Sequence, residues 1–372
     1  MREYSQTKQV LRLLFWETTI KCNLACAHCR RLESDDAASS DLSTEQAKSL
    51  IKQLAELGTR QASMPVLVFS GGEPLCRGDL FDLVEYARSL DIAPALATNA
   101  TLINSTVAAR INESGVVRVA VSLDGATAEI HDRLRQLEGA FESAVTGIRH
   151  LRDKNVSFQI NITLTRSNAE QLEEVYRLAK SLGAVAVHVF MLVPVGCGQA
   201  LAETDMLAPE QYEQKMVDIC RLDSRGELQM KVTCGPHYER VVREQGLHGS
   251  RKGISRRAGS IPGRTGHGSG SRGCLAGLGV VFVGHQGDVF PCGYLPVKCG
   301  NVLEEELGAI WRESRDLARM RDGSDLRGKC GLCSYRQVCG GCRGRAYAAT
   351  GDYMAAEPFC AYIPPGAAGV CL

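Results

Sequence analysis

The sequence predicts an α/β protein in which a partial (β/α)6 barrel of the TIM type precedes a cysteine-rich C-terminal domain. From residue 11 to about 222, runs of β-branched residues alternate with amphipathic helical stretches, which is typical of a parallel sheet with right-handed crossovers. Beyond residue 273, cysteines recur at close spacing. We therefore expect a barrel at 1–222, a connecting segment at 223–273 and a C-terminal domain at 274–372.

The alternation predicts the individual elements. Strands are expected at 11–19, 65–72, 93–100, 116–125, 156–165 and 184–196, and helices at 43–58, 80–90, 104–115, 140–155 and 168–183. In the first helix, Ser43 and Gln46 predict a capping box and Gly58 predicts the C-terminal end. Its apolar face consists of Ala47, Leu50, Ile51, Leu54 and Leu57. No G-x-G-x-x-G follows the first strand, which argues against a dinucleotide-binding fold.

Composition narrows the environment and the partners. A net charge of +1 gives no reason to expect nucleic acid or a membrane surface as a partner. The longest apolar run near the start is too short to cross a bilayer and lacks the order of a signal peptide. We therefore expect a cytoplasmic protein, in which thiols stay reduced. Its 16 cysteines are then metal ligands before they are disulfide partners.

Polar or glycine-rich residues follow each expected strand. Because the carboxyl ends of parallel strands meet at one face of a barrel, these residues predict a single site there. Each feature alone also has a structural explanation, as a turn or a helix cap. In chain order they are Cys22, Cys26 and Cys29, then Gly71, Gly72 and Glu73, then Asn99, then Ser122 and Asp124, then Thr163 and Arg166, and finally residues 192–196.

The first loop carries three cysteines as C-x3-C-x2-C. A structural zinc site takes four protein ligands, and this loop supplies only Cys22, Cys26 and Cys29. We expect His28 to be packed or at the surface, because its neighbours would be the ligands. A cubane iron–sulfur cluster held by three thiolates instead leaves one iron open to an outside ligand.

"CNLACAHC" followed by "SGGEP" resembles the radical S-adenosylmethionine (SAM) superfamily. The resemblance implies that the open iron binds the amino and carboxylate groups of SAM, and that one electron cleaves SAM to a 5′-deoxyadenosyl radical. It also implies roles for residues at the strand ends. Gly71, Gly72 and Glu73 would receive the SAM amino group, Asn99, Ser122 and Arg166 the ribose and carboxylate, and the stretch 192–195, with Val193, the adenine.

A second group of cysteines follows residue 273. "CGLCSYRQVCGGC" reads by itself as a zinc ribbon, but together with the upstream C-x12-G-x4-C it resembles a SPASM domain, which binds auxiliary [4Fe-4S] clusters. The last spacing is x2 where the family has x3, which leaves the cluster served by Cys342 in question. By resemblance, one cluster would take Cys330, Cys333, Cys339 and Cys360, and another Cys274, Cys292 and Cys342, with Cys299 as a candidate fourth ligand.

The other cysteines divide into two kinds. Cys76, Cys220 and Cys371 are expected to fill space as free thiols. Cys197 and Cys234 lie in glycine-containing loops near the expected barrel mouth and are candidates for the substrate site. Cys234 and His237 are also guesses for an axial ligand to a substrate metal.

The stretch 246–273 is rich in Gly, Ser and Arg and has no acidic residue. Such a composition predicts a flexible connection between domains. The arginines could also bind a substrate with several carboxylates. On that interpretation, replacing Arg256 and Arg257 with Ala should raise the dissociation constant of the substrate.

"VFMLVPVGCG", "VTCGPHYERV" and "CGGCRGRAYAATGDYMAAEPFC" resemble the radical SAM heme synthases of the alternative, siroheme-dependent heme pathway. The resemblance implies oxidative decarboxylation of two propionates of iron-coproporphyrin III to vinyl groups, with a ferredoxin or flavodoxin as electron donor.

Three alternatives stay open. One is a sister enzyme that removes acetate groups from a siroheme derivative. A SPASM peptide maturase is another, although an N-terminal peptide-binding domain would be expected ahead of its first strand. The third is a zinc or electron-transfer protein without catalysis.

Overall fold

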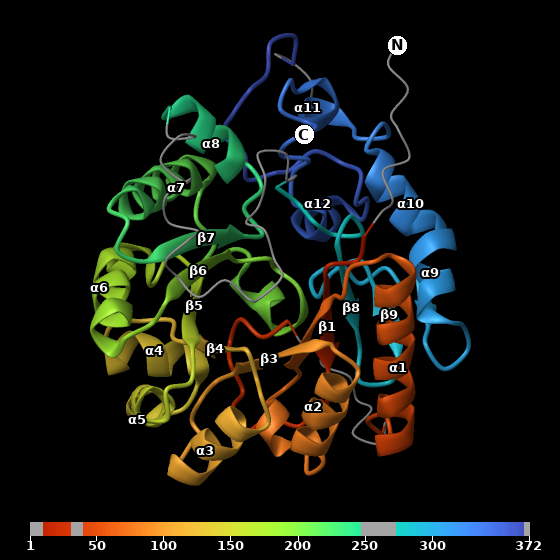
Figure 1. The fold of residues 1–372 in the computed structure, drawn as a ribbon. Helices are drawn as coiled ribbons and strands as arrows, with labels where there is room; N and C mark the ends of the chain where they lie inside the picture. The colour runs from red at the N-terminus through yellow and green to blue at the C-terminus, as the bar shows by residue number, and fades with distance from the viewer. Residues whose placement is uncertain (1–9, 31–39, 247–272, 368–372) are drawn as a thin grey trace.

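The computed structural model describes residues 10–30, 40–246 and 273–367. Arg256, Arg257 and Cys371 lie outside these residues, so the predictions made for them stand as predictions. The described chain forms one sheet in the order β10-β9-β8-β1-β2-β3-β4-β5-β6-β7. Figure 1 shows the sheet curving around the middle of the molecule, with the C-terminal segments over one end.

The six expected strands are confirmed, but each is two to seven residues shorter than its expected run. Successive strands pair in parallel, for example Trp16 of the first with Phe69 of the second. All their carboxyl ends therefore lie at one face, as a barrel site requires. The strands are β1 (Leu13–Glu17), β2 (Val66–Ser70), β3 (Ala93–Thr98), β4 (Arg118–Ser122), β5 (Phe158–Leu164) and β6 (Ala186–Met191).

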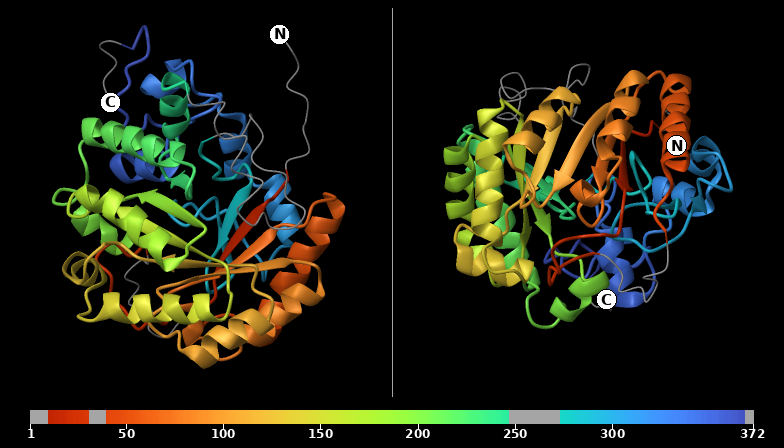
Figure 2. Two further views of the ribbon diagram at one scale, coloured as in Figure 1. Left: turned by 60° about the vertical axis from the view of Figure 1, so that its left-hand side comes forward. Right: turned by 90° about the horizontal axis from the view of Figure 1, so that it is seen from below.

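Helices connect these strands and cover the outer face of the sheet (Figure 2). The five expected helices are present, and three more were not expected from the sequence: Ala128–Arg135, Pro209–Ser224 and Tyr238–Glu244. The helices are α1 (Thr44–Arg60), α2 (Leu80–Ser89), α3 (Ser105–Glu113), α4 (Ala128–Arg135), α5 (Ala140–Asp153), α6 (Leu172–Leu182), α7 (Pro209–Ser224) and α8 (Tyr238–Glu244). Short 3-10 turns η1 (Pro74–Cys76), η2 (Ala169–Gln171) and η3 (Gly196–Leu201) complete this part of the chain.

Helix α1 confirms its predicted start but not its predicted end. The Ser43 hydroxyl accepts from the Gln46 amide at 3.3 Å, and the Gln46 side chain accepts from the Ser43 amide at 2.9 Å. Gly58 does not end the helix, which continues to Arg60. The glycine instead allows Met64 to pack closely against the helix, because a Cβ at position 58 would lie 2.5 Å from the Met64 sulfur.

The sheet extends beyond the expected barrel on both sides. Strand β7 (Gln229–Thr233) pairs with β6 after the expected boundary at 222. Strand β8 (Val280–Val283), from the cysteine-rich part, pairs in parallel with β1. Strands β9 (Asp288–Phe290) and β10 (Gly300–Asn301) follow it antiparallel. The C-terminal part is thus joined to the barrel through backbone hydrogen bonds beside the three-cysteine loop.

The C-terminal part has its own small core. Leu295, Met320 and Met354 are buried together, and Cys274, Cys292 and Cys330 pack against them. Its helices are α9 (Leu307–Glu313), α10 (Arg315–Asp322), α11 (Gly328–Leu332) and α12 (Arg343–Thr350).

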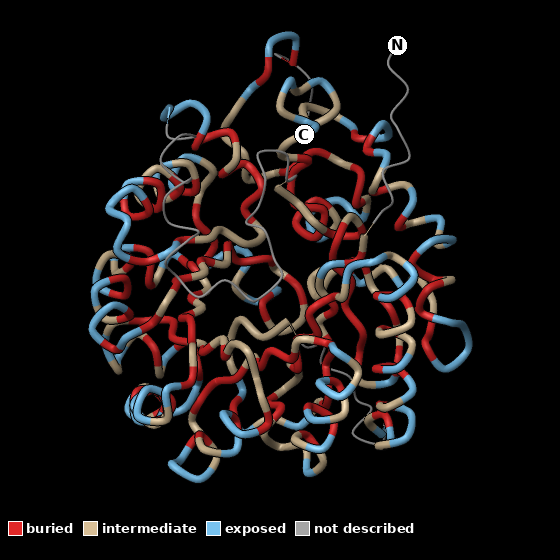
Figure 3. The backbone as a smooth tube through the Cα atoms, viewed as in Figure 1, coloured by how far each residue is buried: buried red, intermediate tan, exposed pale blue. Residues whose placement is uncertain are grey.

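Burial follows the strands and the inner faces of the helices (Figure 3). Of the described helices, none is both long and apolar enough to cross a membrane.

Candidate active site

The three-cysteine loop follows β1 and is held at several points. The Thr18 amide donates to the Ser70 carbonyl at 2.9 Å, and the Ala27 amide to the Leu134 carbonyl at 3.0 Å. At its far end, Arg30 lies 3.1 Å from the Glu17 carboxylate. The Leu24 amide donates to the Cys22 sulfur at 3.4 Å. Cys22, Cys26 and Cys29 therefore stand on a fixed loop at the carboxyl ends of the strands.

Gly71 and Gly72 let the end of β2 approach this loop. The Gly72 amide donates to the Thr19 carbonyl at 2.7 Å, and the Glu73 amide to the Lys21 carbonyl at 2.8 Å. A Cβ on Gly72 would lie 2.4 Å from the Lys21 oxygen, and one on Gly71, at φ +153°, 2.6 Å from the Thr19 oxygen. Both glycines are required by this close backbone contact, whatever further role they have toward SAM.

Glu73 is fully buried, and its carboxylate holds the end of β3. One oxygen accepts from the Thr98 hydroxyl at 2.8 Å and the Leu75 amide at 3.2 Å, and the other from the Asn99 amide at 2.8 Å. Burial raises the pKa of Glu73 to about 7, although the three donors favour the ionised form. A carboxylate offers about four acceptor positions, so most of this capacity is used within the protein.

We expect Glu73→Gln to destabilise the protein by about 1–3 kcal/mol, because the new amide nitrogen would face a buried donor. The measurement is the unfolding midpoint under anaerobic conditions at a pH below the Glu73 pKa, where Glu73 is neutral and the comparison with Gln does not include the cost of a buried charge. Glu138→Gln, which alters an exposed carboxylate, is the control. Equal midpoints for the two variants would contradict this role of Glu73.

Asn99 connects β3 to the three-cysteine loop. Its side-chain nitrogen donates to the Asn23 side-chain oxygen at 3.0 Å. Its side-chain oxygen accepts from the Thr101 backbone amide at 2.9 Å. The structure therefore brings Cys22, Glu73 and Asn99 together, as the strand-end pattern predicts.

A buried ion pair lies beside the cysteines. Asp124 is fully buried, and its carboxylate lies 2.6 Å from Arg135 and 3.2 Å from the His28 ring. Arg135 also donates to the Cys26 sulfur at 3.6 Å. Burial raises the pKa of the Cys26 thiol, and the Arg135 charge opposes that rise. Arg135 therefore favours a thiolate at Cys26, the form that binds a metal.

Sequence reasoning missed Arg135 because it lies on α4 and follows no strand. His28 is packed against Asp124, as expected of a residue that is not a metal ligand.

Three further SAM-contact candidates are Ser122, Arg166 and Val193. Ser122 ends β4 and is half-buried. Arg166 is exposed and donates to the Met206 carbonyl at 2.9 Å. Val193 is only 2% exposed and packs against Cys342 and Tyr294. Their assignments to ribose, carboxylate and adenine stay predictions.

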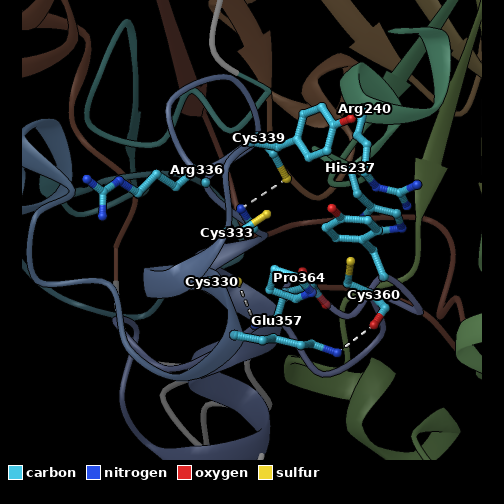
Figure 4. Close-up of a pocket in the computed structure, with 14 residues that line it drawn as sticks. His237, Arg240, Cys330, Cys333, Arg336, Cys339, Glu357, Cys360 and Pro364 are labelled. Atoms are coloured by element: carbon cyan, nitrogen blue, oxygen red, sulfur yellow. Dashed lines mark hydrogen bonds between the residues drawn. The ribbon is translucent and has the colours of Figure 1, made fainter. Parts of the chain in front are cut away.

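Four C-terminal cysteines line one pocket: Cys330, Cys333, Cys339 and Cys360. Figure 4 shows thiols from this set directed into a common space, with His237 beside them. Among the described residues, no three His, Cys, Asp or Glu side chains could hold a single metal ion. The pocket fits the four-thiolate donor set that a [4Fe-4S] cluster requires.

His237 is also part of this pocket. It is 1% exposed, and neither ring nitrogen has a hydrogen-bond partner within the described structure. Burial lowers its pKa to about 3, so the ring is neutral. Its place among the C-terminal cysteines does not support the guess that it is an axial ligand at the barrel mouth.

Cys339 and Cys342, although only three positions apart, belong to different groups of thiols. The glycines between them, Gly340 and Gly341, have φ of 74° and 63°, which turns the chain sharply. Cys339 lines the four-cysteine pocket. The charge of Cys342 instead raises the pKa values of Cys274 and Cys292. The x2 spacing thus suffices to send the two thiols to different sets.

Cys299 does not join the set of Cys342. Its thiol donates to the Val297 carbonyl at 3.5 Å, and the residue packs against the large barrel core. No cysteine figures among the causes of its raised pKa. These contacts give no support to Cys299 as a fourth ligand, because its thiol contacts the Val297 carbonyl and the residue packs against the barrel core. Cys220 is buried in the barrel core, as expected of a filler.

A second buried ion pair connects the two C-terminal cysteine sets. Arg345 and Glu357 are 0% and 1% exposed at their side chains and pair bidentately at 2.9 and 3.0 Å. Glu357 also accepts from the Cys342 amide at 2.7 Å, and its own amide donates to the Cys330 sulfur at 3.3 Å. One carboxylate residue therefore positions a cysteine of each set.

The C-terminal cysteines approach the three-cysteine loop through Tyr294. Burial raises the pKa of Tyr294, and the charges of Cys234, Arg30 and Cys29 all bear on it. Arg30 lies over the Phe282 ring of β8 at 4.0 Å. Tyr294 packs beside Cys342, and a Cβ on the preceding Gly293 would lie 3.4 Å from the Arg30 side chain, so this segment is near both the loop after β1 and Cys342.

A parallel sheet with three thiols at its carboxyl face, extended by a domain with two further thiol sets, defines the class of radical SAM proteins with a SPASM domain. Models of the radical SAM superfamily and of the SPASM iron–sulfur cluster-binding domain match residues 16–179 and 274–343. The chain belongs to the radical SAM superfamily.

The AdoMet-dependent heme synthase of Methanosarcina barkeri is 43% identical to this chain over 95% of it and 97% of that protein. The Fe-coproporphyrin III synthase of the same organism is 28% identical, over 96% of this chain and 89% of that protein. Streptococcus suis SuiB bound to S-adenosylmethionine shares the fold, with a TM-score of 0.72 at 16% identity, over 95% of this chain and 78% of SuiB.

Proposed function

We propose that this protein converts iron-coproporphyrin III to heme b by oxidative decarboxylation of two propionates to vinyl groups. The observation that carries the proposal is the 43% identity, along nearly the whole chain, with a heme synthase. The 28% identity with the Fe-coproporphyrin III synthase of the same organism makes the sister reaction the second candidate.

The residues after β1 are proposed to bind the SAM cluster. A cubane held by Cys22, Cys26 and Cys29 would supply an open iron and the electron that cleaves SAM to a 5′-deoxyadenosyl radical. Arg135 would keep Cys26 in its thiolate form, and Glu73 and Asn99 would fix the neighbouring strand end. We propose that Gly71, Gly72, Glu73, Asn99, Ser122, Arg166 and Val193 form the SAM pocket.

We propose that an iron–sulfur cluster held by the C-terminal thiolates would receive an electron. Loss of a hydrogen atom from the propionate β-carbon, followed by loss of carbon dioxide, forms the vinyl group and leaves one electron over. Tyr294 packs beside Cys342, and its neighbour Gly293 lies close to Arg30 of the three-cysteine loop, which supports a path for that electron toward the SPASM domain. We propose a ferredoxin or flavodoxin as the source of the cleaving electron, and a cytoplasmic location, where the thiols stay reduced.

The substrate assignment is tested by asking which tetrapyrrole stimulates SAM cleavage. Reduced, cluster-loaded protein is incubated anaerobically with SAM and either iron-coproporphyrin III or the siroheme derivative, and 5′-deoxyadenosine is quantified. We expect iron-coproporphyrin III to stimulate its formation at least about tenfold more, a preference of roughly 1.4 kcal/mol. Preference for the siroheme derivative would establish the sister reaction instead.

A further inference from the structure

The second thiol set, Cys274, Cys292 and Cys342, has three cysteines where a fully ligated cubane needs four. The candidate from the sequence, Cys299, lies elsewhere. Another thiol reaches the set from the barrel, on the loop between β7 and α8. That thiol is Cys234.

Cys234 contacts the set directly. Cys234 and Tyr294 pack against the buried cluster of Val193, Val195 and Cys342, so the Cys234 side chain lies beside that of Cys342. The charge of Cys292 also bears on Cys234. Cys234 is thus close to two of the three thiols, although it precedes the first of them by 40 positions in the sequence.

The loop of Cys234 also packs against the residue before Cys274. A Cβ on Gly273 would lie 2.5 Å from the Pro236 carbonyl oxygen, so the two backbones are in contact. Gly273 in turn donates to the Val338 carbonyl, and Cys274 to the Cys339 carbonyl at 3.2 Å. The segment 234–236 therefore lies beside the chain that carries Cys274.

The backbone of Cys234 is in a conformation that few side chains adopt. Its φ is 58°, in the left-handed region, which costs a residue other than glycine roughly 1–2 kcal/mol. The following Gly235 is tightly packed, since a Cβ there would lie 2.6 Å from Val232. Strain of this kind is found where a side chain has a task that fixes its position.

We propose that Cys234 is the fourth thiolate ligand of the auxiliary cluster bound by Cys274, Cys292 and Cys342. The barrel and the SPASM domain then share this cluster, and its site cannot form from the C-terminal part alone. The same assignment removes Cys234 from the candidates for substrate contact. The inference rests on the proposed function to the extent that it requires auxiliary clusters.

The test uses the full chain with Cys22, Cys26 and Cys29 replaced by Ala, so that the auxiliary clusters alone contribute. Cys234→Gly is added, because glycine removes the thiol and suits the positive φ, and Cys299→Ala serves as the matched control. The readouts are iron and acid-labile sulfide per chain, the electron paramagnetic resonance (EPR) spectrum of the reduced protein, and the EPR spectrum after mild ferricyanide oxidation. A cubane corner without a cysteine loses its iron readily, which yields a three-iron cluster.

We expect a three-iron signal on oxidation of the Cys234→Gly chain, and none in the parent or in Cys299→Ala. An unchanged iron content and unchanged spectra in Cys234→Gly would overturn the ligand assignment. A parent chain without iron or sulfide would instead overturn the auxiliary clusters of the proposed function. If Cys234→Gly loses all its iron, Cys234→Ser decides: retained iron with a shifted EPR spectrum supports ligation, and a spectrum identical to the parent contradicts it.

Discussion

Cys26→Ala is expected to reduce formation of 5′-deoxyadenosine to the level of the reaction without protein. The physical reason is that two thiolates do not hold a cubane with one open iron at the carboxyl face of the barrel. Burial raises the pKa of the neighbouring Cys22 to about 11, so that thiol deprotonates only with the help of a bound metal. The measurement is product analysis after anaerobic reduction with dithionite.

Cys76→Ser is the matched control for this prediction. Cys76 lies at the end of η1, and the charge of Glu73 bears on its pKa, yet it is not part of the three-cysteine loop. We expect at least half of the wild-type rate in this variant. Equal loss of activity in both variants would show that any thiol replacement near Glu73 is harmful. That result would contradict the assignment of Cys26 as a cluster ligand.

Arg345→Met is expected to lower the stability of the protein by about 3–5 kcal/mol. The side chains of Arg345 and Glu357 are 0% and 1% exposed, and removal of one partner leaves a buried charge unpaired. Because Glu357 holds the amide of Cys342 and lies beside Cys330, both auxiliary sites should lose iron together. The unfolding midpoint and the iron content per chain measure the two effects.

Arg327→Met provides the comparison within the same domain. Arg327 pairs with Asp352 at 2.9 Å, but its side chain is 65% exposed. An exposed pair of this kind contributes about 0–1 kcal/mol. If the two variants unfold at the same midpoint with the same iron content, the buried pair does not support the auxiliary sites.

The barrel could be predicted from the sequence because its signals are local. Each β-branched run became a strand, and the capping box of Ser43 and Gln46 formed as expected. The predicted end of α1 at Gly58 was wrong. The glycine at this position allows close packing against Met64, a tertiary contact that the local sequence does not reveal. The pairing of β8 with β1 joins residues 267 positions apart, and no local pattern encodes it.

The site was predictable where it follows strands and hidden where it does not. Glu73 and Asn99 come directly after strands, and the structure brings them to the cysteine loop. Arg135 and Glu357 have no such marker, because their importance comes from burial beside sulfur and charge. The partition of Cys339 and Cys342 between two sets depends on two glycines with positive φ, which the spacing alone does not reveal.

The central claim is tested most directly by following the substrate itself. Cluster-loaded protein is incubated anaerobically with dithionite, SAM and iron-coproporphyrin III, and the tetrapyrroles are analysed by mass spectrometry over time. We expect stepwise loss of two units of formic acid mass to give heme b, with one 5′-deoxyadenosine formed for each vinyl group. Formation of 5′-deoxyadenosine with no change in the mass of iron-coproporphyrin III would contradict it.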